Sequence, residues 1–176
     1  MGRPKALLEY RGETFVGRLA RVLGAHCDVV VVGSAFQAAA GFPAGVRTVV
    51  NFAPERGQLS SLQTALATLP PDIEGFLFTP VDSPAADEST VARIIAEFRR
   101  ANPLVVIPRH NGRKGHPVCA SPEIAAELLA MPPTGSAREV IRRHADRTLF
   151  LDTEDAGILA DVDDPEAYRQ LIGATP

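Results

Sequence analysis

The sequence predicts a single α/β domain over residues 1–176, with a mostly parallel, Rossmann-like sheet and helices on both faces of that sheet. Short apolar runs, such as the four valines at 29–32, have the length of strands that are covered on both faces. Stretches with apolar side chains at helical spacing lie between these runs. Strands that alternate with helices favour right-handed βαβ units, and 176 residues suffice for one hydrophobic core.

The first half of the chain follows this alternation from its first helix onward. Residues 12–25 repeat apolar side chains at helical spacing, and Gly24 provides a stop signal. The β-branched run at 28–33 ends in glycine and predicts a strand that is buried on both faces. The next predicted elements are a helix at 35–40, a strand at 46–50, a helix at 59–69, a strand at 76–79 and a helix at 87–100.

The second half departs from parallel alternation near residues 104–120. Asn111-Gly112 is a strong hairpin signal, and it lies between a strand at 104–108 and the apolar segment 117–119. We therefore expect an antiparallel hairpin excursion there. The remaining predicted elements are helices at 122–130 and 136–145, strands at 147–151 and 158–162, and a last helix that begins at Pro165 behind an aspartate N-cap.

Composition and charge argue against several classes of protein. Lys and Arg number 18 and Asp and Glu 21, which gives a net charge of −3 and no basic stripe for nucleic acid. The apolar runs are far shorter than the roughly 20 residues that span a bilayer, and no signal core precedes them. We therefore expect a cytoplasmic protein that binds neither nucleic acid nor membrane. Cys27 and Cys119 are too few for a disulfide framework or a zinc site.

Carboxylates follow two of the predicted strands. Asp82 comes directly after the strand at 76–79, and ligands of open parallel sheets bind beyond the carboxyl ends of the strands. A carboxylate there suits Mg²⁺ on a phosphate, although an aspartate beside prolines also stabilises turns. Alternation along the strand at 158–162 sends Asp161 and Asp163 to one face, so both could approach one cation. Asp164 is more simply a helix cap.

Three further segments contain candidate binding residues. Residues 51–62 open a helix at which Ser60 or Ser61 can cap, and the exposed N–H groups suit an anion or a nucleotide. His116 lies between a glycine and a proline, as a ligand-binding or a turn histidine. Arg138 lies in the first turn of a helix and suits an anionic ligand or a surface ion pair. No nucleophile motif or phosphate loop is present, so covalent catalysis is not indicated.

Taken in order, these motifs resemble those of the molybdopterin nucleotidyltransferases, most closely the molybdenum cofactor cytidylyltransferases, which have the nucleotide-diphospho-sugar transferase fold. Each motif alone is weak, but their common order makes the resemblance specific. The matching segments are Gly2-x-Pro4-Lys5, Asn51 to Leu62, Val81-Asp82-Ser83-Pro84, Gly115-His116-Pro117, Gly135-Ser136-Ala137-Arg138 and Asp161-Val162-Asp163-Asp164-Pro165.

The resemblance implies transfer of a nucleoside monophosphate from an NTP, with CTP favoured over GTP, to molybdopterin with release of pyrophosphate. A molybdenum hydroxylase would then receive the product. Lys5 and Asp82 would be catalytic, with Asp82 and Asp163 holding Mg²⁺ and Lys5 neutralising the triphosphate. The nucleotide would meet Gly2, Lys5, Asn51, Gly57, Ser60 and Ser61, and the pterin substrate would meet Gly115, His116, Pro117 and Arg138.

The chain departs from the family pattern at its N-terminus. The family's Leu-Ala-Ala-Gly-x-Ser-x-Arg signature, which forms the first strand and a glycine loop, has no counterpart before Gly2. We therefore expect that the biological start lies upstream, and that two strand edges lack a ladder partner. Two other functions stay open: a non-catalytic nucleotide- or cofactor-binding accessory protein for molybdenum hydroxylases, and a nucleotidyltransferase that acts on a sugar or polyol phosphate.

Overall fold

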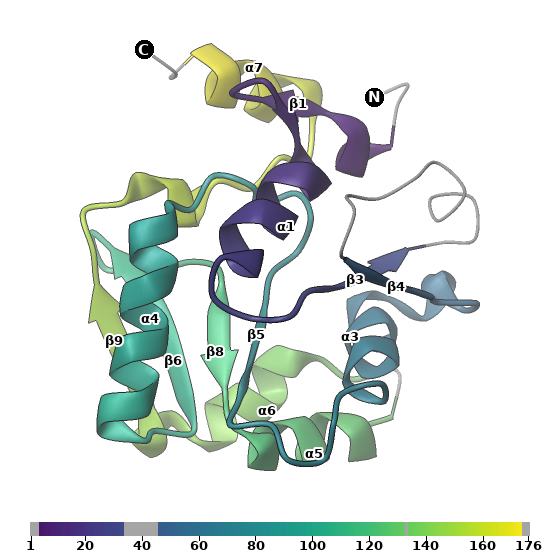
Figure 1. Cartoon of the computed structure of the whole chain (residues 1–176), viewed down its shortest axis with the longest axis vertical. Helices are drawn as coiled ribbons and strands as arrows, with labels where there is room; N and C mark the ends of the chain where they lie inside the picture. Colours follow the sequence, from purple (N-terminus) through teal and green to yellow (C-terminus); the bar gives the residue numbers. More distant parts are fainter. Residues whose placement is uncertain (1–3, 34–45, 133, 174–176) are drawn as a thin grey trace.

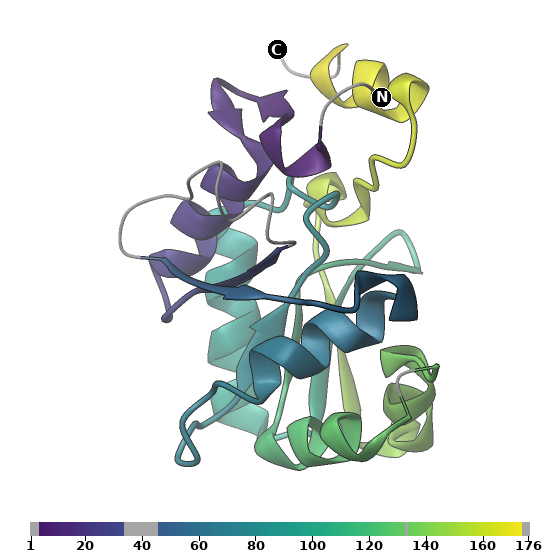
Figure 2. The ribbon, with the colours of Figure 1, turned by 90° about the vertical axis from the view of Figure 1, so that its right-hand side faces the viewer.

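The computed structural model describes residues 4–33, 46–132 and 134–173, and they form the expected α/β fold with helices around a mixed sheet (Figures 1 and 2). The α-helices are α1 (Phe15–Gly24), α3 (Gln58–Leu66), α4 (Glu88–Ala101), α5 (Pro122–Ala130), α6 (Ala137–Arg143) and α7 (Pro165–Gly173). Short 3₁₀ turns are η1 (Lys5–Leu7), η2 (Pro54–Arg56), η3 (Ala145–Arg147) and η4 (Ala156–Leu159). The predicted helix at 35–40 lies outside the described residues.

The largest sheet has the strand order β5–β8–β6–β9, and the short β7 pairs antiparallel with the last two residues of β6. Because β5 and β6 are both antiparallel to β8 and β9 is parallel to β6, the strands β5, β6 and β9 run in one direction. The sheet is thus mostly parallel, as predicted. The strands of this sheet are β5 (Phe76–Phe78), β6 (Val105–His110), β7 (Arg113–Lys114), β8 (Val118–Ala120) and β9 (Thr148–Asp152).

Side-chain alternation along β6 explains why helices cover both faces of this sheet. Val106 packs with Ile94 and Phe98 of α4 on one face. Val105 and Ile107 point to the other face, where α3, α5 and α6 supply the core. On that second face, the fully or nearly fully buried helix residues are Leu59, Leu66, Ile124, Leu128 and Val140. A strand with apolar residues at every position is the pattern expected of burial on both faces.

Two tight hairpins each have a two-residue turn in which both residues have positive φ and the second is glycine. Asn111 and Gly112 join β6 to β7 with φ angles of 47° and 77°, which confirms the predicted hairpin excursion. A second hairpin joins β1 (Glu9–Tyr10) to β2 (Glu13–Thr14), and its turn residues Arg11 and Gly12 also have positive φ. The sequence did not predict this hairpin, because two-residue strands show no periodicity.

A separate two-stranded parallel sheet pairs β3 (Val30–Gly33) with β4 (Arg47–Val50). The prediction that this valine run is buried on both faces was wrong, since residues 30–32 are only half-buried. Within the described part of the chain, β3 pairs only with β4 and β5 only with β8. One edge of each strand therefore has no ladder partner there, and β3 loses the cover that a central strand receives.

Three further boundaries differ from the predictions or concern the ends of the chain. The strand expected at 158–162 is not formed, since η4 occupies its first half and the following residues belong to no ladder. The helix expected at 136–145 ends at Arg143, where η3 follows. α7 begins at Pro165 as predicted, with Asp164 Oδ1 accepting from the N–H groups of Glu166 and Ala167.

Among the helices described, none is long and apolar enough to span a membrane.

Candidate active site

A small hydrophobic cluster joins the N-terminal hairpin, the segment after β5 and the segment before α7. Its buried members are Tyr10, Phe15, Ala85 and Val162. The main-chain N–H of Val162 donates to the carbonyl oxygen of Asp82 at 2.9 Å. This contact brings residues that are 80 positions apart in the sequence side by side, and it places Asp82 against the aspartates that flank Val162.

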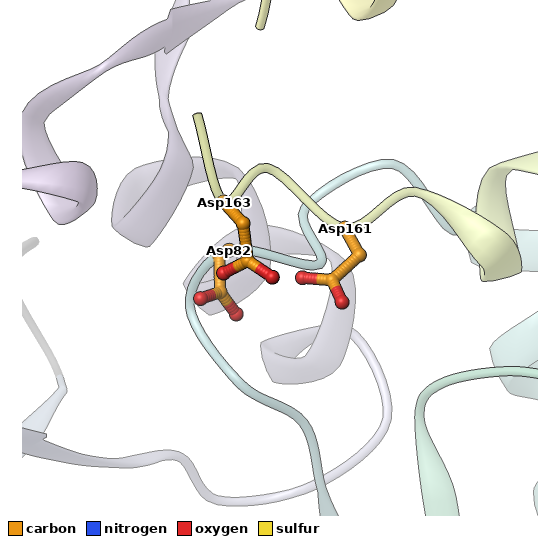
Figure 3. A group of neighbouring side chains, drawn as sticks. All are labelled: Asp82, Asp161 and Asp163. Atoms are coloured by element: carbon orange, nitrogen blue, oxygen red, sulfur yellow. The ribbon is translucent and has the colours of Figure 1, made fainter. Parts of the chain in front are cut away.

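Three carboxylates meet at this junction (Figure 3). Asp82, Asp161 and Asp163 each offer one oxygen atom, and these atoms all lie within 4.8 Å of one another. Partial burial raises the pKa of Asp161, and the neighbouring charges of Asp163 and Asp82 raise it further. Such repulsion is relieved when a cation binds between the carboxylates, and a set of carboxylate oxygens suits a hard divalent cation.

Lys5 provides a cation to this acidic cluster. Its Nζ atom lies 2.9 Å from Asp82 Oδ2 and 2.8 Å from Asp163 Oδ1. Partial burial opposes the charged form of Lys5, but the hydrogen bonds to Asp163 and Asp82 outweigh it and raise the pKa of the ammonium group. Three predicted site residues, Lys5, Asp82 and Asp163, are thereby in direct contact, and Asp161 lies beside them.

His116 lies near the same cluster, on the cis peptide that precedes Pro117. Its main-chain N–H donates to the carbonyl of Ile158 at 3.0 Å, and its ring meets the edge of Phe78 at 6.3 Å between centroids. Burial lowers the pKa of His116, and a hydrogen bond with the main chain of Phe78 and the charges of Asp161 and Asp82 oppose this shift only in part. The imidazole is therefore mostly uncharged at neutral pH, which suits a neutral donor or acceptor toward a ligand.

Gly115 allows the close approach of this segment to η4. A Cβ atom at Gly115 would overlap the carbonyl oxygen of Ile158, whereas a Cβ atom at Gly173 of α7 would meet nothing within 4 Å. We expect Gly115→Ala to destabilise the fold by about 1 to 3 kcal/mol, because the main chain must shift. The matched Gly173→Ala change is expected to stay within about 0.5 kcal/mol of the unsubstituted chain. Chemical denaturation of both variants checks this, and equal midpoints would contradict it.

The predicted nucleotide-binding segment forms a hydrogen-bonded network at the start of α3. Asn51 Nδ2 donates to Ser60 Oγ at 2.8 Å and to Ser61 Oγ at 3.0 Å, and Asn51 Oδ1 accepts from the N–H of Ala53. The prediction that Ser60 or Ser61 caps the helix was wrong. Gly57 is the N-cap residue, with φ of 92° and no side-chain cap, and Ser60 Oγ donates back to its carbonyl. The first N–H groups of α3 thus receive no side-chain cap.

Another predicted binding residue, Arg138, lies away from the acidic cluster. Arg138 is exposed on α6, and Figures 1 and 2 place α6 and α7 at opposite ends of the molecule. Since Asp163 lies just before α7, the structure does not bring Arg138 to that aspartate. Gly2 lies outside the described residues. The roles of Gly2, Gly57 and Arg138 stay predictions.

One site contact had no counterpart among the sequence predictions. Asp155 accepts hydrogen bonds from the N–H of Gly157 at 2.8 Å and, across the fold, from the N–H of Asp87 at 2.8 Å. The Asp-x-Gly spacing is typical of a local turn, so the sequence signal accounts for the first bond and not for the second. Asp155 therefore helps to hold the segment between Asp82 and α4.

The acidic group beyond the end of β5 lies where ligands of open α/β sheets bind. Residues 1–148 match the family model of the MobA-like NTP transferase domain, and the chain belongs to this family. The resemblance inferred from the sequence motifs is therefore confirmed at the level of the family. Comparison with curated proteins finds no match.

Several solved structures share the fold. Rv0371c from Mycobacterium tuberculosis H37Rv is 26% identical, with a TM-score of 0.80 over 99% of this chain and 91% of that chain. Its complex with manganese gives 24% identity and a TM-score of 0.76 over 97% and 92% of the two chains. Molybdopterin-guanine dinucleotide biosynthesis protein A from Archaeoglobus fulgidus is 12% identical, with a TM-score of 0.71 over 98% and 90%.

Proposed function

We propose that this nucleotidyltransferase transfers a nucleoside monophosphate from an NTP, with CTP favoured over GTP, to the phosphate of molybdopterin. An oxygen of the acceptor phosphate attacks the α-phosphorus, the bond from that phosphorus to the bridging oxygen breaks, and pyrophosphate leaves. The observation that carries the proposal is the contact of Lys5 with Asp82 and Asp163 beyond the end of β5. The Gly115-His116-Pro117 motif supports a cytidylyltransferase, since the cytidylyltransferases typically have Gly-His-Pro.

Asp82 and Asp163 are the proposed ligands of Mg²⁺, and Asp161 is placed to act as a further or alternative ligand. The donors are all carboxylate oxygens, which fit a hard cation, and a lysine ammonium group already occupies the space between two of them. The manganese complex of the similar mycobacterial protein supports a divalent cation as the cofactor. When bound, the ion supplies positive charge to the triphosphate as the α-phosphorus is attacked.

The other residues of the proposed site supply positive charge or orient the substrates. Lys5 supplies a second positive charge toward the triphosphate, and the uncapped start of α3 with Asn51, Ser60 and Ser61 binds the nucleotide. Because such displacement requires positioning more than covalent chemistry, no nucleophilic side chain is needed. On the acceptor side we place His116 with Gly115 and Pro117, and Arg138 approaches a more distant part of the substrate.

The product of this reaction would pass to a molybdenum hydroxylase. A reaction that consumes a nucleoside triphosphate is consistent with a cytoplasmic location. The same family and acidic cluster are also compatible with a sugar-phosphate or polyol-phosphate acceptor, because a fold does not fix a substrate.

Pyrophosphate release tests the proposal. The chain is incubated with CTP, GTP, ATP or UTP, with and without Mg²⁺, and with molybdopterin, a sugar phosphate or no acceptor. We expect release only when CTP, or more slowly GTP, is combined with Mg²⁺ and molybdopterin. A parallel thermal shift detects binding, since a ligand at about 100 times its Kd stabilises by about 2.7 kcal/mol, or roughly 5 to 10 °C. Nucleotide binding without release would overturn catalysis in favour of an accessory role.

A further inference from the structure

Arg18 of α1 is a charged residue in the protein interior, with only 6% of its surface exposed. It lies three residues after Phe15 and four before Val22, at the edge of the buried face of α1. Its Nε atom donates to the carbonyl oxygen of Pro84 at 2.9 Å, and Nη2 donates to that of Ala86 at 3.4 Å. Both carbonyl groups belong to the segment that immediately follows Asp82.

The chemistry of the guanidinium group suits this position. The side chains of residues 83–86 are buried, yet the segment belongs to no strand, so its carbonyl groups have no ladder partners. A planar guanidinium can donate to two acceptors at once, and here it also lies 5.3 Å from the ring centroid of Tyr10 and 3.8 Å from Asp87 Oδ1. These partners compensate for the burial of its charge.

The same segment also contacts η4 and its N-cap residue, Asp155. Asp155 Oδ2 accepts from the N–H of Asp87, and a Cβ atom at Gly157 would overlap the carbonyl oxygen of Ala85. The segment therefore contacts both α1 and η4. In addition, the carbonyl oxygen of Asp82 accepts from the main-chain N–H of Val162. With these contacts to α1, η4 and Val162, the main chain at Asp82 has little freedom to move away from the aspartates before α7.

We infer that Arg18 is a positioning residue, which fixes the segment after β5 so that Asp82 stays within reach of Asp163 and Lys5. The consequence for metal binding rests on the function proposed above, whereas the restraint that Arg18 places on the segment after β5 does not. The variant Arg18→Lys tests the planar shape of the guanidinium group separately from its positive charge. A lysine keeps one positive charge but offers a point donor in place of a planar fork that bridges two carbonyl groups.

Hydrogen exchange and Mn²⁺ affinity test this inference on the full chain. We expect Arg18→Lys to increase amide exchange within residues 82–87 and to weaken Mn²⁺ binding about tenfold by electron paramagnetic resonance. Arg21→Lys is the matched control, since Arg21 lies on the same helix but forms exposed ion pairs with Glu13 and Glu88. That control is expected to change neither measurement. In Arg18→Ala, added guanidinium ion at millimolar concentration is expected to restore Mn²⁺ affinity in part.

Each result decides between the alternatives. If Arg18→Lys and Arg21→Lys show the same exchange at 82–87 and the same Mn²⁺ affinity, Arg18 is not a positioning residue. If Arg18→Ala does not fold, the comparison of the two lysine variants decides alone. If the unsubstituted chain binds no Mn²⁺ while amide exchange at 82–87 still differs between the two lysine variants, the proposed metal chemistry is wrong. Arg18 then still restrains the segment after β5.

Discussion

Asp82→Asn is expected to lower the rate of pyrophosphate release at least a hundredfold and to weaken Mn²⁺ binding about tenfold. Asparagine has nearly the same shape, so the main-chain contact with Val162 is kept. What is lost is the negative charge that faces Lys5 and two further carboxylates. A metal that loses an anionic ligand binds less tightly, and the positive charge that the ion supplies to the reacting phosphate is then lost, at a cost of roughly 10² to 10³ in rate.

Asp164→Asn is the matched control for this change. Asp164 is adjacent to Asp163, yet its Oδ1 atom accepts from two N–H groups at the start of α7. An asparagine oxygen can accept the same hydrogen bonds, so we expect the cap and the rate to be nearly unchanged. Pyrophosphate release and Mn²⁺ affinity are measured on both variants. A rate for Asp82→Asn within threefold of the unsubstituted chain would exclude Asp82 as a catalytic metal ligand.

The position of Asp82 could be predicted from the sequence because it depends on a general property of α/β sheets. Ligands bind beyond the carboxyl ends of parallel strands, and the apolar run at 76–78 identifies such a strand. The placement of Asp161 and Asp163 on one side was also correct, although no strand forms there. Both residues flank Val162, which is 1% exposed, and when the residue between them is buried, both neighbours turn toward the solvent and Asp82.

The role of Arg18 could not be predicted, because its partners lie far away in the sequence. The carbonyl of Pro84 is 66 residues from Arg18, and main-chain acceptors leave no signature in a sequence. Helical periodicity places Arg21 away from the apolar residues, and its side chain is about half exposed, whereas Arg18 lies three residues after Phe15 at the edge of the buried face. The capping role expected of Ser60 failed for a local reason, since α3 begins at Gln58, and Ser60 lies within its first turn.

Lys5→Met is expected to change two measurements in opposite directions. Without nucleotide, Mn²⁺ affinity should rise about fivefold, and pyrophosphate release should fall about a hundredfold. The first effect follows because the ammonium group occupies the space between Asp82 and Asp163 that a divalent ion would use. Two ion pairs between partly exposed groups are worth roughly 1 kcal/mol together, which corresponds to about fivefold in affinity.

The fall in rate follows from the second role of Lys5. If a divalent ion displaces the ammonium group from the two carboxylates, the freed charge is available to the triphosphate, and methionine cannot supply it. Lys114→Met is the control, because Lys114 lies on β7 over the ring of Phe150, and among the described residues it forms no ion pair with Asp82, Asp161 or Asp163. That variant should match the unsubstituted chain in both measurements.

The two measurements distinguish competition from simple loss of charge. A lysine that only held the apo site together would, when replaced, leave the carboxylates disordered and weaken Mn²⁺ binding along with the rate. If Lys5 competes with the ion, its removal must strengthen Mn²⁺ binding. The three carboxylates carry more negative charge than one ammonium group neutralises, and without Lys5 all of that charge is available to the ion. Weaker Mn²⁺ binding by Lys5→Met would therefore contradict competition, even if the rate fell as expected.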